Sequence, residues 1–119
     1  MSTIAVVLAA FVALEHLGFL VLEMFLWSGP IGQKVFRTTP QVAADSRVLA
    51  ANQGLYNGFL AAGLVYGLLA KDGAVGTALV GFALSCVVVA GVFGAATVSK
   101  RIFFVQAVPA ALALAALFL

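Results

Sequence analysis

The sequence predicts an all-α integral membrane protein, an antiparallel bundle of four transmembrane helices forming one domain over residues 1–119. Hydrophobic residues make up 65% of the chain and charged residues only 8%, whereas a soluble domain is about 45–50% apolar and about 25% charged. The charged residues also leave four long apolar stretches, and a bilayer core about 30 Å thick needs about 20 helical residues. This composition excludes a soluble enzyme, a disordered chain and a nucleic-acid-binding protein.

We expect the four spans at residues 4–27, 49–70, 74–98 and 102–119, with a cytoplasmic loop at 28–48. Gly29 and Pro30 predict the end of the first helix, because these residues terminate helices. Thr39 followed by Pro40 predicts an N-cap and the first residue of the second helix. The connections after the second and third spans are short, which implies antiparallel neighbours.

The basic residues predict how the chain is oriented. The loops after the first and third spans hold Lys34, Arg37, Arg47, Lys100 and Arg101. The opposite side has only Lys71, next to Asp72. Basic residues favour the cytoplasmic side. We therefore expect a multi-pass protein of a bacterial-type plasma membrane with both termini outside the cytoplasm.

The first predicted span carries three ionisable residues: Glu15, His16 and Glu23. A charged side chain at the bilayer centre costs about 2.5–3.5 kcal/mol on insertion scales. At 100° per residue, His16 and Glu23 lie about 20° apart around the helix, and all three residues fit within one third of its circumference. We expect this face to point into the bundle.

The second predicted span supplies a matching polar set, Asn52, Gln53, Tyr56 and Asn57. Because the two helices are antiparallel, Glu23 should lie level with Asn52 and Gln53, and Asn57 should approach the level of His16. Gln106 in the fourth span lies near the same end, with Pro109 freeing a carbonyl one turn back. Together these residues predict a polar pocket for a ligand.

A structural interpretation stands beside the functional one. Asn and Gln in membrane helices often join helices, at about 0.6 kcal/mol per contact on average. Gly54 with Gly58, and Gly63 with Gly67, are small-residue pairs that predict close helix packing within the bundle, with a homodimer contact as the alternative. The single cysteine, Cys86, excludes an internal disulfide and a thiolate metal cluster.

Two segments resemble a known membrane family. They are EHLGFLVLEMFLWSGPIGQKVF (residues 15–36) and LAANQGLYNGFLAAGL (residues 49–64). They are similar to the family catalogued as domain of unknown function thirteen-oh-four, whose members are short four-span proteins. The resemblance implies that the following motif positions belong together: Glu15, His16, Glu23, Trp27, Pro30, Asn52, Gln53, Tyr56 and Asn57. It implies no mechanism.

Three functions remain open at this point. The first is binding or transport of a small cation or cationic molecule, with proton coupling. The second is a metal-binding membrane enzyme or metal carrier that uses Glu15, His16 and Glu23, although Glu23 lies about 10 Å along the helix axis from His16. The third is an accessory protein in which the polar set only fixes helix packing. A divalent metal is the one cofactor considered, because the sequence has no haem or nucleotide motif. The expected partner is the lipid bilayer.

Overall fold

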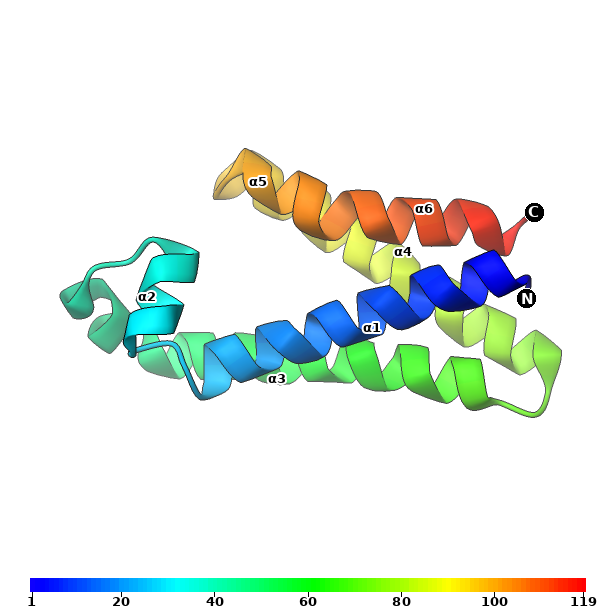
Figure 1. Ribbon diagram of the computed structural model, residues 1–119, viewed down its shortest axis with the longest axis horizontal. Helices are drawn as coiled ribbons and strands as arrows, with labels where there is room; N and C mark the ends of the chain where they lie inside the picture. The colour runs from blue at the N-terminus through cyan, green and yellow to red at the C-terminus, as the bar shows by residue number, and fades with distance from the viewer. The chain divides into compact units, whose positions relative to one another are not determined.

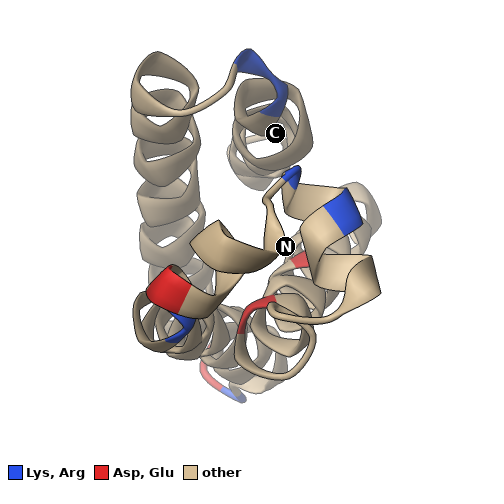
Figure 2. Ribbon diagram, turned by 90° about the vertical axis from the view of Figure 1, so that its left-hand side faces the viewer, with Lys and Arg blue, Asp and Glu red and all other residues tan.

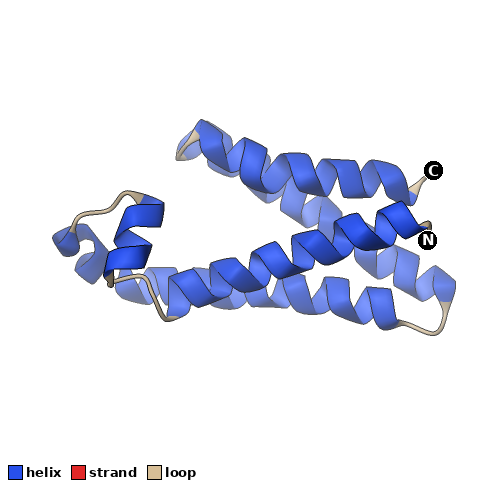
Figure 3. Ribbon diagram, viewed as in Figure 1, coloured by secondary structure: helices blue, strands red, loops and turns tan.

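The computed structural model describes all 119 residues, which form helices joined by short loops, without β-strands (Figure 3). In chain order the elements are α1 (Thr3–Met24), α2 (Pro30–Phe36), α3 (Pro40–Leu69), α4 (Gly73–Thr97), α5 (Lys100–Ile102), the π-helical segment η1 (Phe103–Ala107) and α6 (Val108–Leu117) (Figure 1). The predicted all-helical fold is confirmed. By its internal contacts the chain forms two compact units, residues 1–14 with 60–119, and residues 15–59.

Three helices are long and apolar enough to cross a membrane: α1, α4 and the stretch Lys100–Leu117. Charged residues are few and lie at scattered positions along the chain (Figure 2). The chain is therefore a multi-pass membrane protein. With 30 residues α3 is the longest helix, but it is not one of the three, because its middle carries Asn52, Gln53 and Asn57.

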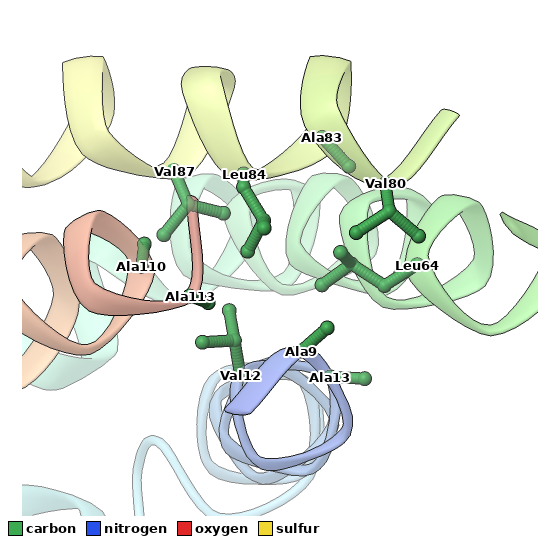
Figure 4. Packing of buried hydrophobic residues seen from close by; sticks show 10 residues of the cluster. All are labelled: Ala9, Val12, Ala13, Leu64, Val80, Ala83, Leu84, Val87, Ala110 and Ala113. Atoms are coloured by element: carbon green, nitrogen blue, oxygen red, sulfur yellow. The ribbon is translucent and has the colours of Figure 1, made fainter. Parts of the chain in front are cut away.

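The core of the first unit is built from small and branched apolar side chains. Leu64 of α3 and Leu84 of α4 have no exposed surface. The residues that α1 and α6 contribute to this core are mostly alanines, and their small side chains let these helices approach their neighbours closely. The cluster consists of Ala9, Val12, Ala13, Leu64, Val80, Ala83, Leu84, Val87, Ala110 and Ala113 (Figure 4).

The turn between α3 and α4 follows from its sequence. The carboxylate of Asp72 accepts hydrogen bonds from the backbone N–H groups of Ala74 at 2.9 Å and Val75 at 3.2 Å, which caps the first turn of α4. Beside the turn, a Cβ atom added to Gly76 would lie 2.6 Å from the carbonyl oxygen of Gly67. These two glycines therefore let α3 and α4 pack with their backbones almost in contact.

The last helix differs from the regular span expected at residues 102–119. Between α5 and α6 the segment η1 is a π-helix, and the N–H of Val108 donates to the carbonyl of Phe103, five residues back. Pro109 follows directly, and it has no N–H to donate to Val105. The wider π turn lies where proline removes a regular helical hydrogen bond, and the sequence predicts the freed carbonyl but not the π turn.

In the second unit, α1 ends at Met24, three residues before the expected end of the first span. The expected loop at 28–48 contains α2 and the first turns of α3. Pro30 is the first residue of α2, and Arg37 ends that helix in the left-handed conformation at φ 55°. The predicted start of the next helix at Pro40 is confirmed, and the Thr39 hydroxyl accepts from the N–H of Val42 at 3.2 Å.

Candidate functional site

A buried polar pair joins α1 to α3 in the second unit. The side-chain amide of Asn57 donates to Oε1 of Glu23 at 2.6 Å. Glu23 is 8% exposed and Asn57 is 6% exposed. A buried polar group without a partner is costly, so each of these side chains satisfies the other where water is excluded. This contact is therefore a direct polar link between α1 and α3.

The helices approach closely at this level because α3 carries glycines. A Cβ atom on Gly54 would lie 2.8 Å from Cγ of Met24 and 3.1 Å from Cβ of Glu23. One turn further, a Cβ atom on Gly58 would lie 2.6 Å from Cδ1 of Leu20. The pair Gly54 and Gly58 thus serves packing within the chain and brings α1 near enough for Asn57 to reach Glu23.

The register of this contact differs from the expected one. The sequence predicts that Glu23 lies level with Asn52 and Gln53, and that Asn57 approaches the level of His16. Instead Glu23 meets Asn57, about one helical turn further along α3. The glycine contacts explain the difference, because they fix which residues of the two helices can come closest, and a helical period alone does not determine an axial offset.

Glu15 and His16 lie side by side on α1, about two turns from Glu23. The His16 side chain is fully buried, and its ring packs edge-on against Phe19 with 5.1 Å between ring centroids. Glu15 is partly exposed, but its Oε1 atom is buried and has no hydrogen-bond partner. A polar atom without water or a partner is costly. Glu15 is therefore the one acidic side chain with an unused buried oxygen.

The remaining predicted residues are more exposed. The Asn52 side chain donates to the carbonyl of Val48 in its own helix at 2.8 Å and is exposed. Gln53 is exposed, and Tyr56 is 58% exposed with its ring edge-on to Phe59. Gln106 belongs to the first unit, where it is half-buried in η1. Of the eight predicted residues, the structure directly joins Glu23 and Asn57.

Comparison with known proteins identifies the family. The profile described as "Protein of unknown function (DUF1304)" matches residues 10–118. The chain belongs to this family. A curated relative, the "Uncharacterized protein YpaA" of Lactococcus lactis subsp. lactis (strain IL1403), is 30% identical over 116 residues, which is 96% of each chain. No solved structure matches. The resemblance drawn from residues 15–36 and 49–64 is thus confirmed.

Trp27 is tied into this DUF1304 structure by a contact that sequence analysis missed. Its indole N–H donates to the hydroxyl of Ser46 at 3.1 Å, and that hydroxyl donates to the carbonyl of Val42 at 2.6 Å. The indole ring also packs against Phe36 of α2, with 4.8 Å between ring centroids. These contacts hold the loop after α1 to α2 and α3. The sequence pattern for Ser46 alone gives no indication of this partner.

The titratable residues of the DUF1304 chain do not gather into a metal centre. No group of three or more His, Cys, Asp or Glu side chains is placed so that it could hold a metal ion. A metal at Glu15, His16 or Glu23 would accordingly need ligands from outside that set. Carboxyl and imidazole groups are able to bind a positive charge or to exchange a proton.

Proposed function

We propose that this DUF1304 protein binds a small cation or cationic molecule at Glu15 within the membrane and carries it across. In this proposal α3 is a fourth span, with both termini outside. The five basic residues predicted to lie on the cytoplasmic side support that orientation. A 30-residue helix would be about 45 Å long, enough to cross the bilayer even though its middle is polar.

The observation that carries the proposal is the unpartnered Oε1 atom of Glu15. A buried carboxyl oxygen that has no hydrogen-bond donor gains most from a ligand that brings positive charge or an N–H group. The neighbouring His16 and Glu15 itself are groups that can take up a proton when the ligand leaves. Competition between a proton and a cation for one carboxylate is a simple basis for proton-coupled transport.

The other predicted ligand residues take secondary roles in this proposal. Glu23 and Asn57 bond to each other and hold α1 against α3. Asn52, Gln53 and Tyr56 supply polar groups towards the cytoplasmic side for the approaching ligand, and Gln106 stays a separate prediction in the first unit. Substitutions at these positions, measured in the same way as Glu15→Gln, test their contribution.

An accessory role is the second candidate, and the bond between Glu23 and Asn57 favours it. That bond uses two predicted ligand residues for helix packing alone. If all the polar residues served packing, changing Glu15 would alter the stability of the protein and leave ligand responses unchanged.

The deciding experiment compares wild type with Glu15→Gln in detergent by thermal unfolding, using tetramethylammonium and tetraphenylphosphonium as probes, with elemental analysis alongside. Glu23→Gln is the matched control, because it also neutralises an α1 carboxylate and keeps an oxygen that accepts from Asn57. Stabilisation by a probe that is lost only in Glu15→Gln supports cation binding. An unchanged probe response in Glu15→Gln, or no response in wild type, refutes it. Uptake of the same probe into vesicles then tests transport.

A further inference from the structure

The exposed face of α2 combines apolar and basic side chains. Ile31, Lys34 and Val35 are spaced by three and four residues, so they lie on one face of this short helix. Ile31 is 57% exposed and Val35 is 36% exposed, and Lys34 is exposed beside them. The opposite face carries the buried Gly32 and the half-buried Phe36, which pack within the second unit. Helices that lie in the surface of a membrane combine apolar and basic residues in this way.

Helix α2 is held close to the end of a helix that can cross a membrane. Helix α1 ends at Met24, and α2 follows after a short loop (Figure 1). Gly32 of α2 is pressed against the carbonyl oxygen of Leu26, and the side chain of Gln33 donates to the carbonyl of Ser28 at 2.9 Å. The 22 residues of α1 match a bilayer core that takes about 20 helical residues. A chain that crosses the membrane with α1 therefore has α2 at the membrane surface.

Two arginines lie at the same end of the second unit as α2. The ring of Trp27 packs against Phe36 with 4.8 Å between ring centroids, and its N–H donates to the hydroxyl of Ser46 at 3.1 Å. Arg37 directly follows Phe36, and Arg47 directly follows Ser46. The contacts of Trp27 therefore gather the two segments that carry these arginines.

We call Lys34, Arg37 and Arg47 the basic patch. All three residues are exposed, and no hydrogen bond or ion pair engages their side chains. Asp45 is the acidic residue of this part of the chain, and its carboxylate accepts a hydrogen bond from Gln41 at 2.9 Å. The basic patch thus carries positive charge that the surrounding chain does not balance.

The backbone at Arg37 supports a role for its side chain. Arg37 ends α2 in the left-handed conformation at φ 55°, and no other non-glycine residue of the chain has a positive φ. Glycine is the residue that favours such a helix end, because an L side chain in this conformation costs free energy. A side chain held in a costly backbone conformation is an indication of function.

We propose that the basic patch binds the phosphate groups of anionic phospholipids, while Ile31 and Val35 enter the apolar edge of the same leaflet. Anionic lipids bring the charge that balances the patch, and each basic residue near a membrane surface strengthens binding by about fivefold. The exposed apolar side chains beside the patch favour a lipid over a free anion in water. This site is independent of the proposed cation site, because it contains neither Glu15 nor His16.

The first test uses the fluorescence of Trp27, the single tryptophan of the chain, which lies at this end of the molecule. The protein is reconstituted in phosphatidylcholine bilayers that contain brominated phosphatidylglycerol, because bromine quenches a nearby indole. We expect stronger quenching than with brominated phosphatidylcholine at the same mole fraction, and a smaller difference in high salt. The triple variant Lys34→Gln, Arg37→Gln and Arg47→Gln should lose this preference for phosphatidylglycerol.

The matched control neutralises the other three of the six basic residues, with Lys71→Gln, Lys100→Gln and Arg101→Gln. It removes the same amount of charge and should keep the preference of the wild type. An equal preference in the two triple variants, or no preference in the wild type, overturns the proposal. Inorganic phosphate tests the other source of the same chemistry. If it stabilises the wild type in detergent but not the variant of the basic patch, the patch binds a soluble anion and the proposal is wrong.

A second test separates the side chain of Arg37 from its backbone. Arg37→Gly suits the left-handed conformation and should leave the unfolding temperature in detergent unchanged or raise it. The same variant should reduce the preference for phosphatidylglycerol by about fivefold. Arg37→Lys retains the positive charge and should retain most of the preference. An Arg37→Gly protein with the full preference of the wild type would contradict the proposed basic patch.

Discussion

The bond between Asn57 and Glu23 should be worth more than an average polar contact in a membrane protein. Side-chain contacts between membrane helices average about 0.6 kcal/mol and reach about 1.7 kcal/mol. Here the donor and acceptor are 2.6 Å apart, and both residues are less than a tenth exposed. A short hydrogen bond in a low-dielectric environment is stronger than an exposed one. We therefore expect a coupling energy of about 1–2 kcal/mol, near the upper end of the measured range.

The measurement is a double-mutant cycle in detergent, with the free energy of unfolding of wild type, Asn57→Leu, Glu23→Leu and the double variant. Asn57→Leu should lower the free energy of unfolding by about 1–3 kcal/mol, because it leaves a buried carboxylate without its donor. The double variant should lose much less than the sum of the two single variants. Glu23→Gln is the control that keeps an acceptor and should cost less than Glu23→Leu.

The reasoning fails if the two single changes are additive. Additivity within about 0.3 kcal/mol would mean that the two side chains do not interact in solution, since residues without contact add in this way. Then the close approach of α1 and α3 would depend on the glycines alone.

Three further sets of substitutions test the packing, a loop contact and a helix cap through the free energy of unfolding. Gly54→Ala should lower the free energy of unfolding by about 1–3 kcal/mol, because its Cβ would meet Met24 at 2.8 Å. Gly18→Ala, with nothing within 4 Å of the added Cβ, should stabilise the protein by up to about 1 kcal/mol. Equal effects of the two substitutions would contradict this prediction. Ser46→Ala should lower the free energy of unfolding by about 0.5–1.5 kcal/mol, because it removes the hydrogen bond with the Trp27 indole. In the Ser46→Ala background, Trp27→Phe should lose little further energy from this hydrogen bond, because the bond is already absent. Asp72→Ala should cost about 1 kcal/mol and Asp72→Asn a few tenths, unless capping of α4 is unimportant.

Features fixed by neighbouring residues could be predicted from the sequence. The start of α3 at Pro40 and the short connection between α3 and α4 depend on residues close together in the chain, and the sequence predicts both. The all-helical fold likewise followed from long apolar stretches. Each of these structural features is determined by consecutive residues, so it can be predicted from the sequence alone.

Features that depend on contacts between distant residues could not be predicted in the same way. The pairing of Glu23 with Asn57 depends on where Gly54 lets two helices touch, and an axial offset has no counterpart in a helical period. The seven-residue helix α2 is too short for a periodic pattern. Its Gly32 is pressed against the carbonyl oxygen of Leu26, a contact that only the folded loop creates.

Because of the π turn between Phe103 and Ala107, the rotation of α6 about its axis relative to α5 depends on a single residue. A bond that spans five residues encloses one more residue than the bond of a regular α-helix. Removing one residue there would restore a regular helix and rotate one side of the helix relative to the other by about 100°. The face of α6 that carries the buried alanines, beginning at Ala110, would then point in a different direction relative to the basic residues Lys100 and Arg101. Related chains that differ in length by one residue at this point should consequently differ in which face of the last helix is small enough to pack.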